Sequence, residues 1–299
     1  MIVTRRALLA AGAALVATAS ARAAGQQRGT PITAAEVIDR IKSKVGIPWA
    51  AKTVDDIVAG RPDIRVQGIA TTMMATLDVV QRAAAAGRNM VITHEPTFYS
   101  HFDTTDELRG DPTFERKRDF IAAHGMVIFR FHDHWHLMKP DGIATGMARE
   151  LGWQKYADPA AERQFVFPAT SLGDFVTAMG TRLNARSMRV IGDPKLQVRR
   201  VAASWGYVSL WPDFIKVASR PDVELIVVGE TREWELVEYV QDQIAAGAPK
   251  ALILLNHVVS EQAGMKYCAE WLAPIVPELP VGFIAAQEPF WQPGGHPGL

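Results

Sequence analysis

Three clusters of histidine and acidic side chains each come directly after a short apolar segment that is typical of a buried β-strand. The apolar segments are residues 90–92, 126–129 and 251–255. The polar residues that follow them are His94 and Glu95; His132, Asp133, His134 and His136; and His257 and Glu261. Because ligands bind beyond the carboxyl ends of the strands in an open α/β sheet, the three clusters are expected to meet in one cleft. A mixture of imidazole and carboxylate donors suits zinc, iron, manganese or nickel.

Strand-like and helix-like segments alternate through most of the chain. Helices are predicted near residues 33–44, 76–86, 111–125, 142–151, 171–183, 212–219, 231–245 and 260–272. Strands are predicted near residues 64–70, 89–93, 126–131, 188–191, 197–203, 223–228, 250–255 and 281–285. This alternation predicts an α/β fold with largely parallel, mixed sheets. We expect two α/β lobes, residues 32–155 and residues 156–299, and the sequence leaves open whether they interleave.

The first residues have the features of an export signal. Residues 1–23 combine a basic start, an apolar run shorter than the about 20 residues that span a membrane, and an A-x-A-like end at Ala21-Arg22-Ala23. The pair Arg5-Arg6 resembles a twin-arginine signal, and an ordinary secretory signal that contains two arginines is the alternative. The mature protein is therefore expected to be periplasmic or otherwise exported. Residues 24–31 are interpreted as a linker, and no later segment is typical of a membrane span.

Charge and cysteine content exclude other classes of protein. The chain contains 32 basic and 32 acidic residues, and three of the arginines lie in residues 1–23, which contain no acid. The mature chain then has a net charge of about −3, which argues against nucleic acid as the main partner. Cys268 is the only cysteine, so no internal disulfide can form. The helical pattern around it indicates a buried, small apolar side chain rather than a nucleophile.

Each polar cluster alone has a simpler interpretation. His94 and Glu95 fit a strand-end histidine beside a surface glutamate. The histidines of residues 132–136 have period two, so they would share one face if extended. They also fit a hydrogen-bonded strip, an adventitious metal-binding loop, or the H-x-H of amidohydrolases. His257 and Glu261 have helical i, i+4 spacing and fit a charge pair. The three clusters together favour a metal site.

The chain resembles the Nif-three-like family of dinuclear-metal-centre, hexameric proteins, some described as GTP cyclohydrolase I type 2. The similarity extends from about residue 32 to Pro289. The family pattern I-T-H-H-P-aromatic corresponds to residues 92–98, H-T-x-x-D to residues 132–136, T-G-E to residues 228–230, and G-H-x-x-[ST]-E-x-x-G to residues 256–264. A strand–Gly-Asp–strand pattern lies within residues 183–201.

Two positions depart from the family pattern. Glu95 stands where the family has its second histidine, and His136 stands where it has the aspartate. The number of histidines and carboxylates is thus preserved while their positions exchange, which we interpret as a swap of ligands. The alternative is that one of the two metal positions is lost or altered.

The resemblance implies two divalent metal ions, Zn, Fe, Mn or Ni, in a cleft between the lobes. Carried over by position, one ion takes Glu95, His136 and Glu261. The other ion takes His94, His257 and the same Glu261, which bridges. His132 and Asp133 are expected to be weak ligands or to orient the ligands.

The implied function is a metal-dependent hydrolase that uses metal-bound hydroxide on an unidentified small molecule, in a homo-oligomer that is expected to be a hexamer. A non-catalytic protein that binds metal or a partner is the alternative. The GTP cyclohydrolase description agrees poorly with export, because GTP is a cytoplasmic metabolite. The sequence contains neither the phosphate-loop pattern G-x-x-x-x-G-K-[ST] nor the G-x-S-x-G pattern of serine hydrolases. No residue is predicted to be directly catalytic, and no organic cofactor is predicted.

Replacing both Arg5 and Arg6 with lysine is expected to retain the precursor in the cytoplasm, because the twin-arginine route requires that pair. Immunoblots of cytoplasmic and exported fractions measure the result. Unchanged export of the double variant would contradict the twin-arginine assignment and support the ordinary secretory signal.

Overall fold

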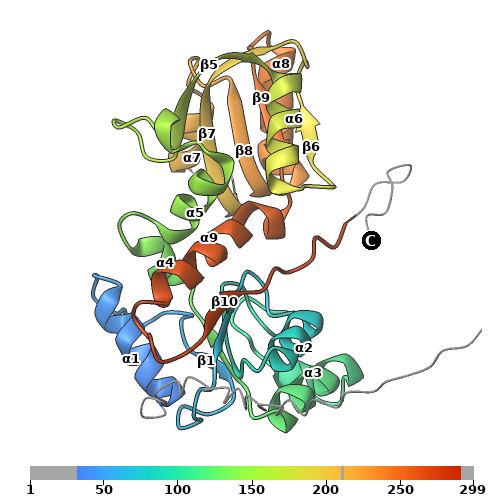
Figure 1. The fold of residues 1–299 in the computed structure, drawn as a ribbon. Coiled ribbons are helices and arrows are strands. Elements are labelled where there is room, and N and C mark those ends of the chain that lie inside the picture. Colours follow the sequence, from blue (N-terminus) through green and yellow to red (C-terminus); the bar gives the residue numbers. More distant parts are fainter. Residues whose placement is uncertain (1–31, 210–211, 291–299) are drawn as a thin grey trace, which may run out of the picture. The chain divides into compact units, whose positions relative to one another are not determined.

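The computed structural model describes residues 32–209 and 212–290, so the predicted signal and linker lie outside the described residues. The described residues belong to one compact unit. Its strands are arranged in two mixed five-stranded sheets, which confirms the predicted α/β class (Figure 1). Among the described residues, no helix is both long and apolar enough to cross a membrane.

The first sheet has the strand order β1-β4-β3-β2-β10. Its strands are β1 (Ile57–Ala59), β2 (Ile69–Thr72), β3 (Met90–Thr93), β4 (Val127–Arg130) and β10 (Val281–Phe283). Strand β1 is antiparallel to β4, and the other neighbours are parallel. The helices of this part are α1 (Ala34–Lys44), α2 (Leu77–Ala85), the short 3-10 helix η1 (Asp106–Leu108) and α3 (Pro112–Ala123).

The second sheet has the strand order β5-β7-β8-β9-β6. Its strands are β5 (Gln164–Ser171), β6 (Arg189–Ile191), β7 (Gln197–Tyr207), β8 (Leu225–Glu230) and β9 (Ala251–Leu254). The three central strands are parallel, and both edge strands are antiparallel to their neighbours. The helices of this part are α6 (Leu172–Leu183), α7 (Pro212–Ala218), the π-helical turn η3 (Glu233–Val237) and α8 (Glu238–Ala245).

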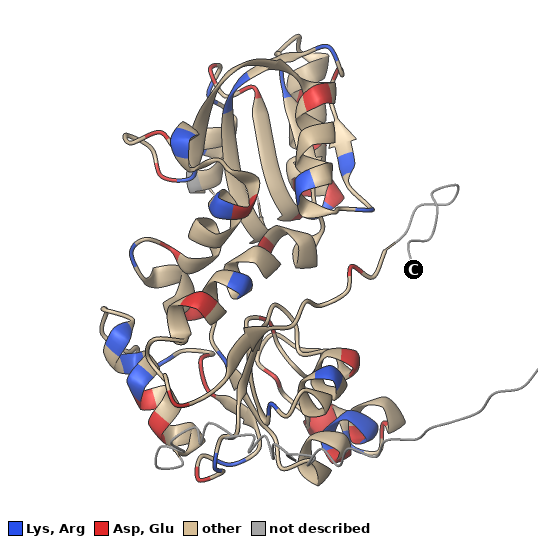
Figure 2. Ribbon diagram, viewed as in Figure 1, with Lys and Arg blue, Asp and Glu red and all other residues tan. Residues whose placement is uncertain are grey.

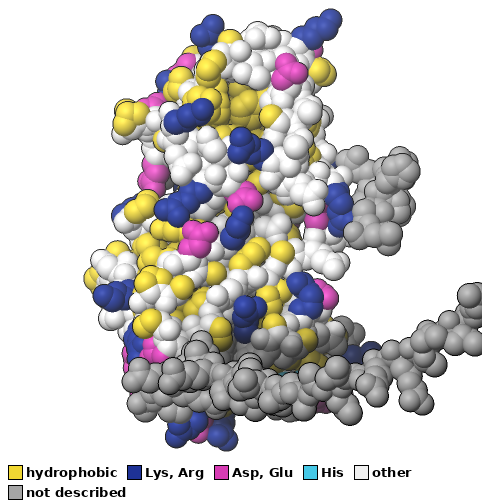
Figure 3. Space-filling view, viewed as in Figure 1, with side chains coloured by type: hydrophobic (Ala, Val, Ile, Leu, Met, Phe, Trp, Pro, Cys, Tyr) yellow, Lys and Arg dark blue, Asp and Glu magenta, His cyan; other side chains and the backbone are white. Residues whose placement is uncertain are grey.

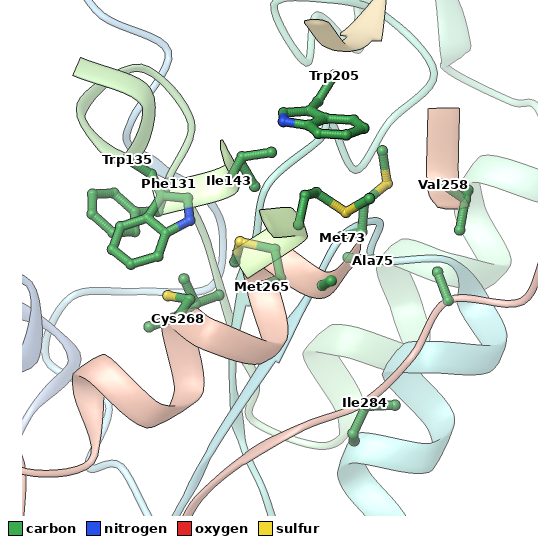
Figure 4. Packing of buried hydrophobic residues seen from close by; sticks show 14 of the residues in the cluster. Met73, Ala75, Phe131, Trp135, Ile143, Trp205, Val258, Met265, Cys268 and Ile284 are labelled. Atoms are coloured by element: carbon green, nitrogen blue, oxygen red, sulfur yellow. The ribbon is translucent and has the colours of Figure 1, made fainter. Parts of the chain in front are cut away.

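The helix α9 (His257–Leu272) joins the two sheets, since it contacts β2 of the first and β7 and β8 of the second. It also packs closely on α5 (Gly142–Leu151), because a methyl group at Gly146 or at Gly264 would overlap the other helix. Figure 4 shows Ile143 of α5 near Met265 of α9, with the buried Cys268 on the same helix. One continuous apolar core therefore includes residues from both sheets.

Local sequence signals account for several helix starts. Thr33 and Glu36 form the predicted capping box, in which the Thr33 N–H donates to Glu36 Oε2 at 2.7 Å. Asp111 accepts hydrogen bonds from the first turn of α3, and Pro112 occupies a position where no N–H is needed. Acidic and basic residues are interspersed on these helices (Figure 2), and the face drawn in Figure 3 carries charges of both signs among apolar side chains.

The structure differs from the sequence-based expectation at several elements. Residues 133–137 form a short helix, α4 (Asp133–Leu137), and not an extended histidine strip, and a 3-10 turn, η2 (Gln154–Tyr156), follows α5. Strands β1 and β5 were not predicted. Strand β10 pairs with β2 of the first sheet, although its residues belong to the expected second lobe. The C-terminal segment thus contributes an edge strand to the first sheet.

A strained residue connects the C-terminal segment to the start of α9. Asn256 has φ 67° and ψ 159°, a conformation that is essentially restricted to glycine. Its side chain accepts from the Val259 N–H at 3.0 Å and donates to Glu288 at 2.8 Å. Glu288 also accepts from the backbone N–H of Arg186 at 2.8 Å. These hydrogen bonds hold the residue that precedes His257.

Replacing Asn256 with alanine is expected to lower the free energy of unfolding by about 1–3 kcal/mol, because the strain remains while the hydrogen bonds are lost. Replacement with glycine should cost less, since glycine adopts this conformation freely. Chemical denaturation of the three proteins measures both effects. Equal losses for alanine and glycine would show that the backbone conformation at this position is not strained.

Candidate metal centre

Six side chains from three chain segments meet beyond the carboxyl ends of strands from both sheets. They are His94 and Glu95 after β3, His132 just before α4 and His136 within it, and His257 and Glu261 in the first turns of α9. The expected convergence of the three clusters is thus observed. Within the described residues, two groups have donor atoms within 4.8 Å of one another: His94 with His132 and His136, and His94 with Glu95 and Glu261.

Glu261 lies at the centre of these contacts. Its Oε2 is 3.1 Å from His257 Nε2 and 3.6 Å from His94 Nε2. Its Oε1 is 3.8 Å from His136 Nε2. The residue is 2% exposed, so its carboxylate is surrounded by imidazole groups in place of water. Two oxygens that face different histidines are the arrangement expected of a bridging carboxylate.

The remaining contacts connect the other side chains of the cluster. His94 Nε2 lies 3.2 Å from His136 Nε2. Glu95 Oε1 lies 3.4 Å from His257 Nε2 and 3.7 Å from His132 Nε2. Glu95 therefore lies beside His257 and His132, whereas His136 lies beside His94. Which of these side chains share an ion stays a prediction, because the donor atoms of His94 lie within 4.8 Å of those of both groups.

Each of the four histidines presents Nε2 to the cluster and bonds an oxygen through Nδ1. The partners are the Phe131 carbonyl for His94 at 3.2 Å, Asp133 for His132 at 2.9 Å, Asp141 for His136 at 3.1 Å, and Glu230 for His257 at 3.0 Å. Metal-binding histidines almost always have such a partner, which fixes the tautomer and the ring orientation. Asp133 has the orienting position that the sequence analysis gave it, and His132 contributes its Nε2 to the cluster itself.

The start of α4 explains why only two of the three histidines in residues 132–136 face the cluster. Asp55 accepts hydrogen bonds from the backbone N–H groups of His132, Asp133 and His134 at 2.7–2.9 Å. The resulting helical turn places His132 and His136 on one face, four residues apart. His134 is held elsewhere, because its Nδ1 bonds Asp55 at 2.7 Å and its Nε2 accepts from the Ala50 N–H at 2.9 Å.

Arg130 is a residue of this region that the sequence analysis missed. Its side chain is 1% exposed and its Nη2 lies 3.8 Å from Glu95 Oε2, while Nε donates to the His94 carbonyl at 3.3 Å. It therefore stabilises the anionic form of Glu95 and fixes the turn that carries both candidate ligands. Asp55 and Asp141 were also missed, since each lies outside the polar clusters, whereas Glu230 lies in the segment that echoes T-G-E.

The electrostatics of the cluster favour a cation. Burial alone would lower the pKa of His257, but hydrogen bonds with three carboxylates outweigh it and raise this pKa to about 12. The carboxylates are those of Glu230, Glu261 and Glu95. Burial alone would raise the pKa of Glu95, but the hydrogen bond with His257 and nearby positive charges lower it to about 2. A divalent ion bound here would satisfy the same carboxylates and displace the histidine proton.

The backbone of the second sheet closes on Glu261. Gly206, at the end of β7, has φ +73°, and a methyl group there would overlap the Glu261 carboxylate. Its N–H donates to Ser260 Oγ at 3.0 Å. Because a side chain at this position would fill the space beside the carboxylate, glycine keeps the cluster open.

Two mixed five-stranded sheets and a buried His/Glu cluster define a two-lobed α/β protein with a candidate metal centre. The family model of Duf34/NIF3 (NGG1p interacting factor 3) matches residues 31–289. The chain therefore belongs to the Duf34/NIF3 family, and the resemblance seen in the motifs is confirmed.

Individual relatives agree with this assignment. A GTP cyclohydrolase 1 type 2 homolog of Clostridium acetobutylicum is 23% identical over 200 residues, which are 63% of this chain and 72% of that protein. The structure of a Bacillus cereus protein related to NIF3 matches with a TM-score of 0.68 and 15% identity, covering 88% of this chain and 99% of that one. Reduced HcgD from Methanocaldococcus jannaschii matches with a TM-score of 0.58 and 15% identity, covering 85% and 98%. At these identities the structural likeness shows the fold alone.

Proposed function

We propose that this chain is a dinuclear metal-binding hydrolase of the Duf34/NIF3 family that acts on a small molecule. The observation that supports it best is the arrangement of four histidines, each presenting Nε2 to the Glu95 or the Glu261 carboxylate while an oxygen holds its Nδ1. The donor set fits two divalent ions, because imidazole and carboxylate groups suit zinc, iron, manganese and nickel. Zinc, iron, manganese or nickel remains the proposed identity.

The contacts suggest which side chains hold each ion. One position would take His94 and His136, the other would take His257, Glu95 and His132, and Glu261 would serve both. When bound, a pair of divalent ions acidifies a water molecule and stabilises negative charge that develops on the substrate. The protein keeps its imidazoles correctly oriented through Asp133, Asp141 and Glu230. Together with His257 and His132, Arg130 keeps the Glu95 carboxylate ionised.

A non-catalytic role is the second candidate, since the same donor set would also serve a protein that only binds metal or a partner. The name of the Clostridium acetobutylicum relative suggests GTP as a substrate. We do not extend that name to this chain, because the proposed export from the cytoplasm would separate it from GTP. We retain export and a hexameric assembly as parts of the proposal. The first is supported by the Arg5-Arg6 pair and the second by family membership.

Elemental analysis is expected to find two metal ions per chain in the wild-type protein and fewer in Glu261→Gln, because that substitution removes the proposed bridge. Asp133→Asn should lower metal affinity by roughly 10–100-fold, since a neutral amide oxygen accepts a weaker hydrogen bond from the ring of His132 than a carboxylate does. His124→Ala is the matched control, because this exposed histidine lies at the end of α3 and its Nδ1 bonds the Phe120 carbonyl, not a group of the cluster.

Turnover separates the two candidate functions. The metal-loaded wild type and Glu261→Gln are compared on a panel of ester, amide and phosphoester substrates. Hydrolysis by the wild type alone supports the hydrolase. Full metal content without hydrolysis of any substrate favours the non-catalytic role, and equal metal content in both proteins would refute the proposed ligands.

A further inference from the structure

A cavity of about 430 Å³ opens beside the candidate metal centre. Glu95, His257 and Glu230 form one part of its wall. The rest comes from the start of α2, from the loop after β3 and from α3, through Met74, Thr76, Leu77, Pro96, Thr97, Tyr99, Ser100, His101 and Lys117. The cavity is large enough for a small molecule that reaches the proposed metal ligands.

Lys117 places a buried positive charge in this wall. The residue is 3% exposed, and its Nζ donates to the Thr97 carbonyl at 2.6 Å. An ammonium group has three donors, so this bond uses one of them. Its Nζ also lies 5.7 Å and 5.5 Å from the ring centres of Phe98 and Tyr99. In the described part of the chain, no carboxylate oxygen lies within 4.0 Å of this ammonium group. Asp103 attracts it from a greater distance, and burial lowers the pKa of Lys117 to about 8. A buried ammonium group without a directly paired carboxylate is costly.

Thr97 provides a second polar group with an unused hydrogen bond. Its hydroxyl is buried and has no hydrogen-bond partner among the described residues, and the residue lines the same cavity. Its backbone is fixed, because the Thr97 and Phe98 N–H groups both donate to Asp103 at 2.7 Å. Buried polar groups are nearly always paired in native proteins. A ligand that accepts hydrogen bonds here would pair with both the Thr97 hydroxyl and the Lys117 ammonium group.

We propose that this cavity is the substrate pocket and that Lys117 binds an anionic group of the substrate, such as a carboxylate, away from the group that reacts. The inference rests on the proposed function, which places the reacting group at Glu95, His257 and Glu261. Lys117 is the one lysine or arginine in the wall of the cavity, all of whose residues are described. The substrate class is therefore a small molecule with an acidic group in addition to a hydrolysable bond.

Two matched probes test the pocket on zinc-loaded protein. 3-Phosphonopropionate carries a phosphonate for the metal centre and a carboxylate for Lys117, whereas propylphosphonate lacks the carboxylate. Calorimetry is expected to show that the wild type binds 3-phosphonopropionate about tenfold or more tightly, the usual effect of a hydrogen bond to a charged group. Lys117→Gln should abolish this preference and leave the affinity for propylphosphonate unchanged, because glutamine keeps a donor for the Thr97 carbonyl.

Thr97→Val provides a second variant that does not remove the buried charge. It should weaken binding of 3-phosphonopropionate without lowering the melting temperature, because the hydroxyl that it removes has no partner in the folded chain. The same preference in Lys117→Gln as in the wild type, or no preference in the wild type, would overturn the proposal.

A measurement without metal separates this inference from the proposed function. The methyl group of Met74 in the cavity wall is followed by nuclear magnetic resonance while 3-phosphonopropionate is added to metal-free protein. A shift in the wild type that is absent in Lys117→Gln supports the pocket. Failure of the chain to take up zinc would refute the proposed metal centre but not the pocket. No shift in the wild type, or the same shift in both proteins, contradicts the anion site.

Discussion

The buried carboxylate of Glu261 is the constraint around which the rest of the centre is arranged. A carboxylate that is 2% exposed is costly unless positive charge and hydrogen bonds surround it. Three imidazoles contact its two oxygens, and they come from β3, α4 and α9. The charge of Glu261 is therefore compensated only when both sheets are folded and in place. Folding of the core and formation of the site are linked in this way.

The same dependence explains the close packing of α9. The helix carries His257 and Glu261 on its first turns and packs through Gly264 on α5. At its start, Asn256 has a conformation that only glycine adopts freely, and Glu288 holds it in place. Because Glu288 follows the last strand of the first sheet, the C-terminal segment connects that sheet to the residue before a proposed ligand. Backbone strain of this kind is typical of functional sites.

Much of this arrangement was predictable from local sequence. The alternating segments predicted the α/β class, and the three clusters after apolar runs predicted the residues that converge. The period-two spacing alone did not separate His132 and His136 from His134, and only the family pattern singled them out. The physical reason is Asp55, which lies 77 residues before His132, caps α4 and binds His134. Arg130 was missed because its position resembles the last residue of an ordinary strand. Strand β10 was predicted, but its pairing with β2 depends on contacts between distant parts of the chain.

Anomalous X-ray scattering from crystals of the zinc-loaded protein tests the central claim most directly. The account predicts two zinc peaks on either side of the Glu261 carboxylate, one beside His94 and His136 and the other beside His257, Glu95 and His132. A single peak would show that the exchanged residues have removed one metal position. One ion shared by Glu95 and His136 would support the family pairing against the grouping proposed here. The absence of any peak at Glu261 would contradict a metal centre formed by these six side chains.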